Sequence, residues 1–344
     1  MHSIASTGRA VQSDLRLRPI GGADRRRLGC DGLRAARSAA AERFDPPLVV
    51  RRFVLAGELT PAELLAEVAR QLDGTSASAE RAFCHGGIHV NGHPLAADAP
   101  PGRITAGSWV VAYAFEREPE PVQAQLRVLH DDDGIVAVDK PAWLPMQRTR
   151  ASARLSLEAA LRAQLGDASL VAAHRLDRQT SGVALFARGA AGAWASRAFA
   201  QRSVAKRYLA VVAPPPQPDA FAVEGWIARA PDPARFRFAL HAGEREDARH
   251  SATSFRVLTR GEERALLEAR PETGRTHQIR VHLAAAGAPL VGDDLYGARY
   301  TPLAASSAER VLLHASRLEL PRPGGGALCI EAEAPADVAG ALSA

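Results

Sequence analysis

The spacing of hydrophobic residues predicts a chain that mixes helices with strands. Apolar residues recur every three to four positions after Thr60-Pro61, where the threonine can cap a helix and the proline suits its first turn. A second helical run covers residues 155–165 and ends at Gly166, a residue type common at helix C-termini. Further helices are expected at residues 190–201 and between Thr273 and Gly287.

Short apolar runs bounded by turn residues predict strands between these helices. Residues 86–92 contain a short strand that enters an Asn-Gly turn, which favours a type I′ hairpin. Residues 126–140 read as two strands around an Asp-Gly turn, and the run that begins at Val183 is continuously apolar, as expected for a buried strand. Other predicted strands cover residues 109–115, 206–212, 253–258 and 265–269.

Composition changes along the chain predict four segments. Residues 1–43 mix arginine with small residues and lack an apolar period, which indicates a disordered tail. Residues 44–118 are expected to form a small domain, residues 119–125 a linker, and residues 126–344 the main domain. The tail holds nine arginines against four acidic residues, which accounts for the net charge of +5. A nucleic-acid surface on the remaining chain must therefore be a local patch.

Composition also limits the compartment and the cofactors. No apolar run is long enough to span a membrane, and the N-terminus has no apolar signal core. Three widely separated cysteines fit free thiols in a reducing cytosol, so a cytoplasmic location is predicted. The sequence has no phosphate-cradling glycine–lysine loop, no dinucleotide fingerprint and no metal-ligand cluster, so neither a nucleotide cofactor nor a metal is expected.

The candidate chemistry lies directly before the buried strand. The run His174-Arg-Leu-Asp-Arg178 places one carboxylate, Asp177, among two guanidiniums and an imidazole. The flanking cations favour its ionised form, and loops held by a rigid scaffold often carry chemistry. Such a carboxylate can be a nucleophile, a general base or half of a structural ion pair. For this short run alone, the ion pair is the favoured interpretation.

Four motifs, taken together and in order, resemble those of RluA-type RNA pseudouridine synthases. They are HRLDRQTSG at 174–182, KRY at 206–208, TGRTHQIRVH at 273–282 and GDDLYG at 292–297. The resemblance covers about residues 126–335 and implies an α+β fold, with a mixed, mostly antiparallel sheet flanked by helices and an RNA cleft across its face. Residues 86–115 resemble the alpha-L RNA-binding module, which implies a small N-terminal α/β domain of that kind.

The resemblance also implies roles for individual residues. Asp177 is the expected catalyst, Tyr208 offers a flat face to uracil and a hydroxyl for proton transfer, and Arg280 is expected to pair with the aspartate. Arg275, in the same motif, is the second candidate for that pairing. Arg175 is expected to enter the space left when the target base leaves its stack. The expected substrate-binding set is Arg175, Leu176, Arg178, Arg275 and Ile279.

The sequence thus predicts a cytosolic, cofactor-free, monomeric isomerase that converts uridines in ribosomal or transfer RNA to pseudouridine. Two alternatives stay open. A non-catalytic RNA-binding factor could keep the fold, although it would need none of Asp177, Tyr208 and Arg280. A glycoside-cleaving hydrolase could pair Asp293 or Asp294 with Asp177, and it would release free base or sugar.

Overall fold

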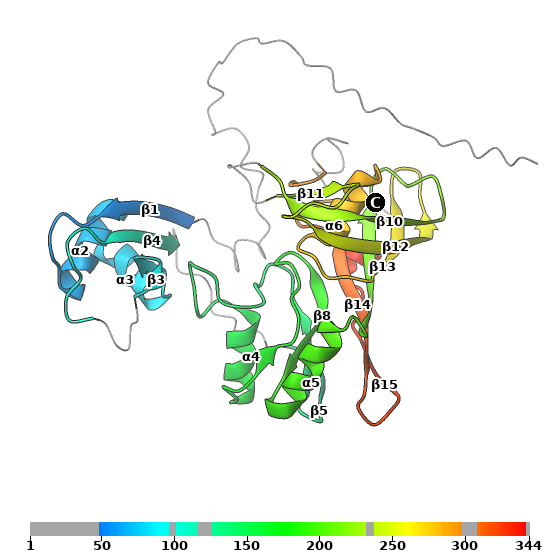
Figure 1. Ribbon diagram of the computed structural model, residues 1–344, viewed down its shortest axis with the longest axis horizontal. Helices are drawn as coiled ribbons and strands as arrows, with labels where there is room; N and C mark the ends of the chain where they lie inside the picture. The colour runs from blue at the N-terminus through cyan, green and yellow to red at the C-terminus, as the bar shows by residue number, and fades with distance from the viewer. Residues whose placement is uncertain (1–47, 96–100, 116–124, 232–236, 298–307, 342–344) are drawn as a thin grey trace, which may run out of the picture. The chain divides into compact units, whose positions relative to one another are not determined.

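A computed structural model describes residues 48–95, 101–115, 125–231, 237–297 and 308–341. The predicted tail and all but the last residue of the predicted linker lie outside these ranges. The described residues form two separate sheets, one of four strands and one of eleven (Figure 1). No helix in the described part of the chain is long and apolar enough to cross a membrane.

The smaller sheet has the strand order β1-β4-β2-β3 and carries two helices. Helix α2 begins as predicted, because the Thr60 side chain accepts a hydrogen bond from the Glu63 backbone N–H and the Glu63 carboxylate accepts one from the Thr60 backbone N–H. The predicted type I′ turn is confirmed by positive φ angles at Asn91 (50°) and Gly92 (87°). The elements are β1 (Leu48–Val54), α2 (Pro61–Leu72), α3 (Ser76–Cys84), β2 (Ile88–Val90), β3 (His93–Pro94) and β4 (Trp109–Phe115).

The larger sheet runs β11-β10-β12-β13-β9-β14-β8-β6-β5, with β15 paired to β14 and β7 paired to β8. All of its pairs are antiparallel except β14 with β8, so the predicted mixed, mostly antiparallel sheet is confirmed. Its strands are β5 (Val128–Asp132), β6 (Ile135–Lys140), β7 (Val171–Ala172), β8 (Ser181–Ala187), β9 (Ala205–Val212), β10 (Ala220–Arg229), β11 (Phe238–His241), β12 (Arg249–Arg260), β13 (Ala265–Pro271), β14 (Leu313–Pro321) and β15 (Ala327–Glu331).

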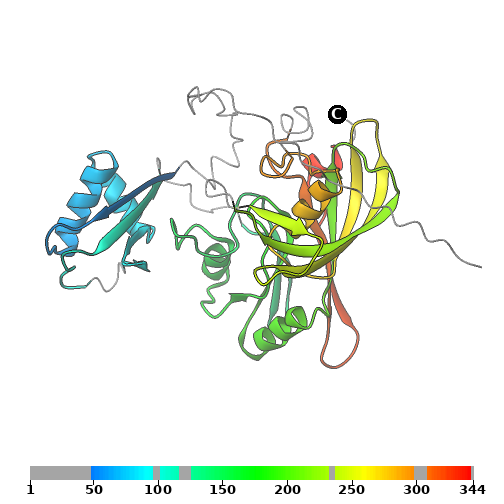
Figure 2. The same ribbon diagram turned by 45° about the horizontal axis from the view of Figure 1, so that its top comes forward.

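Helices cover this sheet on both faces near its centre. Strand β8 is buried along its whole length, and its successive side chains point to opposite faces. Phe186 packs with Leu161 of α4, whereas Leu185 packs with Ala195 of α5. Figure 2 shows α6 against the strands β10, β12 and β13. The helices are α4 (Leu157–Leu165), α5 (Gly189–Ala200), α6 (Gln278–Ala285) and a short α8 (Ala336–Ala339).

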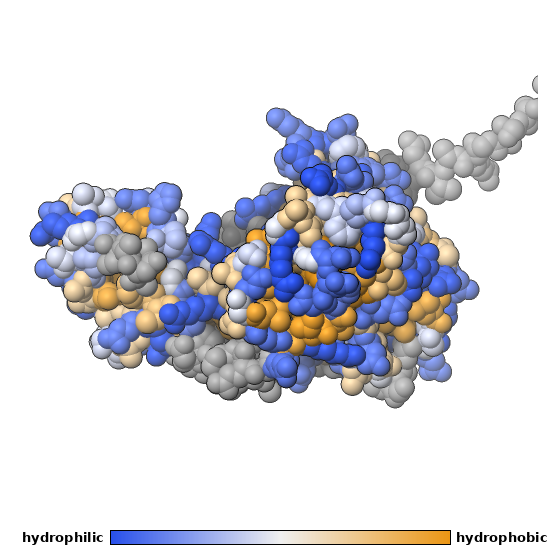
Figure 3. All heavy atoms as spheres, turned by 90° about the horizontal axis from the view of Figure 1, so that it is seen from below, coloured by the Kyte–Doolittle hydropathy of each residue, from blue (hydrophilic) through white to orange (hydrophobic). Residues whose placement is uncertain are grey.

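Small residues on α5 let this helix lie close to the sheet. Its buried positions are Gly192, Ala195 and Ala198. On the same helix, Trp194 lines a separate cavity of about 520 Å³ together with Leu328 of β15. Seen from the side of α4 and α5, the surface combines hydrophobic areas with hydrophilic borders (Figure 3). The residues of the four motifs lie elsewhere: before and at the start of β8, in β9, from the end of β13 into α6, and in the loop after α6.

A glycine joins the two strands that form the parallel pair. Gly182 has φ of +106°, which favours glycine, and a Cβ atom at this position would lie 2.2 Å from the Ala315 carbonyl oxygen of β14. Only a residue without a side chain lets β8 approach β14 so closely. This contact places the loop of residues 174–180 at the N-terminal end of β8, on the side of the sheet where β14 pairs with β9.

Candidate active site

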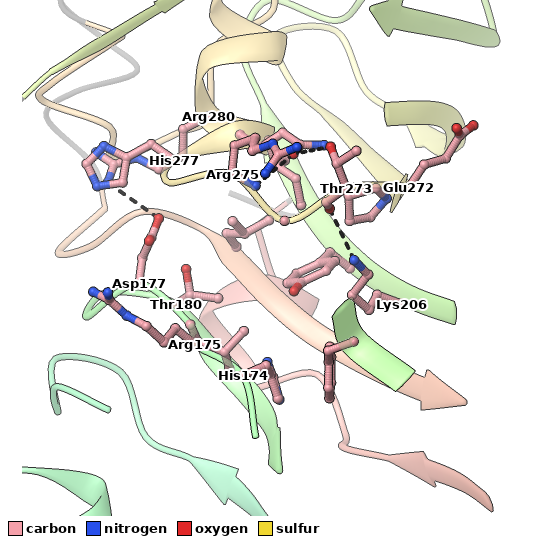
Figure 4. A pocket seen from close by; sticks show the side chains of 18 of the residues that line it. His174, Arg175, Asp177, Thr180, Lys206, Glu272, Thr273, Arg275, His277 and Arg280 are labelled. Atoms are coloured by element: carbon pink, nitrogen blue, oxygen red, sulfur yellow. Dashed lines mark hydrogen bonds and ion pairs between the residues drawn. The ribbon is translucent and has the colours of Figure 1, made fainter. Parts of the chain in front are cut away.

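A pocket of about 450 Å³ brings together the predicted catalytic residues from three separate segments of the chain (Figure 4). The loop before β8 supplies Asp177, strand β9 supplies Tyr208, and the segment from the end of β13 into α6 supplies Arg280. Seven of the eight residues predicted from the sequence line this pocket. They are Arg175, Leu176, Asp177, Tyr208, Arg275, Ile279 and Arg280.

The eighth predicted residue, Arg178, lies outside the pocket lining and is exposed. Its backbone carbonyl helps to shape the loop, because it accepts a hydrogen bond from Lys140. The neighbouring Leu176 is buried, so its side chain forms part of the wall, while Arg175 is exposed at the mouth.

Lys140 holds the Asp177 loop from beneath. Its side chain is fully buried, and its ammonium group donates to the carbonyls of Pro141 (2.9 Å), Arg178 (3.0 Å) and Thr180 (2.7 Å). Burial lowers the pKa of Lys140 to about 7. The charged ammonium has three N–H donors, however, and each of the three carbonyls accepts a hydrogen bond from it. Lys140 therefore ties the end of β6 to the residues that directly follow Asp177.

No role was predicted for Lys140 from the sequence, although the scarcity of lysine in this chain was a signal. The chain has 43 basic residues, and only Lys140 and Lys206 are lysines. A planar guanidinium presents its donors in one plane and cannot reproduce the three-way bonding that Lys140 makes. A rare lysine in an arginine-rich chain therefore indicates a position where the point-like ammonium is required.

Arg280 contacts two carboxylates, and the closer one is not the predicted partner. Its Nε and Nη2 atoms donate to Asp293, both at 2.8 Å, whereas its Nη1 atom lies 3.9 Å from the Asp177 carboxylate. The Asp293 side chain is fully buried, and that of Asp177 is 28% exposed. The expected Arg280–Asp177 pair is thus a longer-range contact, and the hydrogen-bonded partner that holds the guanidinium is Asp293.

This arrangement keeps a positive charge beside Asp177. Burial lowers the pKa of Arg280, but the hydrogen bonds and charge of Asp293, helped by Asp177, outweigh it, so the net pKa is raised. The ring of Tyr296 lies 5.1 Å from the guanidinium carbon and adds a cation–π contact. Arg280 is therefore held rigidly with one side turned toward Asp177, as Figure 4 shows.

Asp293 cannot serve as the second carboxylate of a hydrolase in this geometry. Both of its oxygens are engaged by Arg280, and one also accepts from the backbone N–H groups of Leu295 and Tyr296. Its neighbour Asp294 is exposed and is absent from the pocket lining. The two-carboxylate site of the glycoside-cleaving alternative is therefore not assembled here.

Tyr208 presents its side chain to the pocket from β9. Burial, together with the charge of Asp177, raises the pKa of its hydroxyl above the ordinary value, so this group stays protonated at neutral pH. It can donate a proton or a hydrogen bond but is a poor base. Leu176 and Ile279, both buried, give the pocket its apolar wall.

Gln278 shapes the loop that carries Arg275. Its amide oxygen accepts from the Thr273 hydroxyl (2.6 Å) and the Arg275 backbone N–H (2.9 Å), and its amide nitrogen donates to the Ala252 carbonyl. The Arg275 side chain is fixed separately, because its Nε donates to the His250 carbonyl at 2.9 Å. Arg275 therefore lines the pocket without contacting Asp177 at ion-pair distance.

Comparisons with known proteins agree with the motifs. A family model described as RNA pseudouridylate synthase matches residues 134–285, which include Asp177, Tyr208 and Arg280. "Ribosomal large subunit pseudouridine synthase D" of Nitrosomonas europaea is 34% identical over 256 residues, which cover 70% of this chain and 70% of that protein. This chain belongs to the RluA-type RNA pseudouridine synthase family.

Other relatives in the family extend the comparison. The protein of the same description from Xanthomonas campestris pv. campestris is 36% identical, over 60% of this chain and 65% of its own length, slightly below two thirds. Among solved structures, "Human RNA Pseudouridylate Synthase Domain Containing 1" superposes with a TM-score of 0.54 at 28% identity, covering 66% of this chain and 89% of the human chain. The large sheet is thus the fold of that family.

Two histidines of the family motifs are structural anchors in this site. His174 accepts a hydrogen bond from the Leu185 backbone and stacks on Phe199 with ring centres 4.7 Å apart. Burial and the charge of Lys206 lower the pKa of His174 to about 4, so it is neutral at physiological pH. His282 is buried against Ser251, and burial lowers its pKa to about 4 as well.

Proposed function

We propose that this protein is an isomerase that converts uridine in RNA to pseudouridine, with Asp177 as the catalytic residue. The observation that carries the proposal is a single carboxylate presented to a pocket, 3.9 Å from a buried, rigidly held guanidinium. The other acidic residue in the pocket lining, Glu272, is exposed, and its side chain points away from Asp177 in Figure 4.

The reaction requires little more than this pocket offers. The bond between the sugar C1′ and the base N1 breaks, the base turns, and a bond forms between C1′ and C5. The hydrogen on C5 leaves as a proton and N1 gains one, so atoms and electrons balance without an oxidant or a phosphate donor. Asp177 can attack the sugar, attack the base or take a sugar proton, and each route needs one ionised carboxylate.

The remaining lining residues suit a flipped pyrimidine. A target base must leave its stack to reach the Asp177 carboxylate, and Tyr208, Leu176 and Ile279 provide flat and apolar surfaces for it. Arg175 is exposed at the mouth of the pocket, where its side chain can occupy the vacated position in the RNA. The Nitrosomonas and Xanthomonas relatives are described as ribosomal, so we infer ribosomal RNA as the first substrate to test.

The smaller sheet belongs in this proposal as an RNA-binding module of the alpha-L kind. Its support is the arrangement of α2 and α3 with the hairpin of β2 and β3. Basic side chains are sparse on its two helices, which carry only Arg70 and Arg81, and Arg70 pairs with Glu67 of the same helix. We therefore assign the main RNA contacts to the larger sheet and its pocket.

Asp177→Asn tests the catalytic assignment, because asparagine keeps the shape of the side chain and loses its charge. The variant is expected to fold and bind RNA normally and to release no tritium from RNA labelled at uridine C5. Asp294→Asn, an exposed carboxylate outside the pocket, is the matched control and should keep full activity. Turnover near wild type in Asp177→Asn would refute the assignment.

The substrate is tested by mapping pseudouridines with carbodiimide in cells that carry or lack the gene. One or more ribosomal uridines should lose their modification without the gene and regain it from a plasmid encoding the wild type, but not from one encoding Asp177→Asn. If the Asp177→Asn plasmid restored the modification, the proposal would be contradicted. The protein would then support modification without its own catalytic carboxylate, as an RNA-binding factor could.

A further inference from the structure

Three further basic side chains line the pocket. They come from the turn after α5 (Arg202), from β9 (Lys206) and from the loop before α6 (Arg275). Figure 4 shows Lys206 and Asp177 on opposite sides of the pocket, with Arg275 between them. Arg202 is exposed, whereas Lys206 and Arg275 are half-buried, so the group extends from the rim inward.

Backbone carbonyls orient two of these side chains, and a turn places the third residue. The Lys206 ammonium donates to the Thr273 carbonyl at 3.1 Å, and Arg275 is held by the His250 carbonyl. Arg202 has φ of +58°, in the left-handed region, within a turn closed by a hydrogen bond from its own N–H to the Phe199 carbonyl. A carbonyl orients a cation without neutralising it, so the charges remain available to a ligand.

Carboxylates compensate the arginines on the solvent side of the same strands but not this group. Arg207, next to Lys206 on β9, points to the other face and lies 3.6 Å from Glu268 and 3.5 Å from Glu319. None of the ion pairs found among the described residues includes Arg202, Lys206 or Arg275. The protein therefore concentrates uncompensated positive charge at one end of its pocket.

The charges of the group affect one another. Burial lowers the pKa of Lys206, and Arg202 lowers it further. Burial likewise lowers the pKa of Arg275, with Arg202 and Arg249 adding to the effect. Bringing like charges together costs free energy in the unliganded protein, and an anion bound among them would recover it.

We propose that Arg202, Lys206 and Arg275 form a subsite for a backbone phosphate of the RNA, beside the nucleotide whose base enters the pocket. The inference deepens the proposed function, on which it rests. A phosphate fits this place better than a base does, because the subsite begins at the exposed rim and gathers cationic donors from three segments of the chain. The apolar wall and Tyr208, by contrast, belong to the inner part that receives the base.

The test compares binding of a fluorescent twelve-nucleotide oligouridylate across a salt series. Each lost phosphate contact should flatten the slope of log affinity against log salt by about 0.7. Arg202→Ala and Lys206→Gln should each weaken binding by about tenfold at low salt, and the double variant should lose about 1.4 from the slope. Arg207→Gln, which removes a neighbouring charge on the opposite face, is the matched control and should leave the slope unchanged.

A second probe separates phosphate from base recognition. With the same oligomer carrying neutral methylphosphonate linkages, wild type and the Arg202 and Lys206 variants should bind equally. A variant slope equal to that of the wild type, or a variant defect that persists with the neutral oligomer, would overturn the subsite. Because binding is read without turnover, these outcomes stand even if no RNA is isomerised, and absence of pseudouridine would count against the proposed function alone.

Discussion

At the scale of single residues, the buried pair of Arg280 and Asp293 sets the geometry near Asp177. Both charges are removed from water, so removing either one leaves an uncompensated buried ion. Asp293→Asn is expected to lower the free energy of unfolding by about 3–5 kcal/mol and to reduce turnover. Urea denaturation checks the first effect. Asp294→Asn, one position along and exposed, should change stability by less than about 0.5 kcal/mol, and equal losses would contradict the argument.

Tyr208 offers a second test at this scale. Its raised pKa keeps the hydroxyl protonated, so we expect it to act as a donor and not as a base. Tyr208→Phe retains the ring and should reduce the single-turnover rate by about 10²-fold or more while RNA affinity changes little. The wild-type rate should also show no fall from tyrosine ionisation between about pH 8 and 9. A phenylalanine variant with full rate would limit Tyr208 to stacking.

At the scale of elements, the contact of β6 with the loop before β8 decides where Asp177 lies. Lys140 makes that contact with two loop carbonyls, those of Arg178 and Thr180, and also binds the Pro141 carbonyl. Its loss would leave all three carbonyls without this donor. Lys140→Met should destabilise the protein by about 3–5 kcal/mol. Lys140→Arg should also be destabilising, because a planar guanidinium does not fit. Thermal unfolding measures both, and a stable, active arginine variant would show that charge alone suffices.

At the scale of the whole molecule, buried neutral histidines predict sensitivity to acid. His174 and His282 have pKa values of about 4, below the ordinary 6.5, so the unfolded chain binds more protons between these values. The free energy of unfolding therefore has its full value, as far as these histidines affect it, above about pH 6.5. It falls as the pH drops toward 4, by up to about 1.4 kcal/mol per pH unit for each histidine.

Unfolding by urea at a series of pH values measures this slope. In His282→Gln, any initial loss of stability should be accompanied by a shallower dependence between pH 6.5 and 4. For each protein, the change in the free energy of unfolding with pH is measured first, and these slopes are then compared. The slope reports the titration, whereas the absolute stability does not. A slope unchanged from the wild type would show that His282 does not titrate on unfolding in this range.

Local signals in the sequence determined several elements of this protein and its family. The cap at Thr60, the turn at Asn91-Gly92 and the stop at Gly166 were predicted correctly, because each depends on backbone angles and hydrogen bonds within a few residues. The four motifs identified the family, and with it the residues that line one pocket. The catalytic role of Asp177 remains a prediction.

Only the tertiary structure decided how charges are compensated. Sequence spacing could not select Asp293 over Asp177 as the hydrogen-bonded partner of Arg280, nor show that Lys140 binds the two carbonyls that follow Asp177 in its loop. It also could not show that glutamates neutralise Arg207 while the adjacent Lys206 binds a backbone carbonyl. The physical reason is that electrostatic interaction depends on distance and burial, and both are set when segments far apart in the chain pack together.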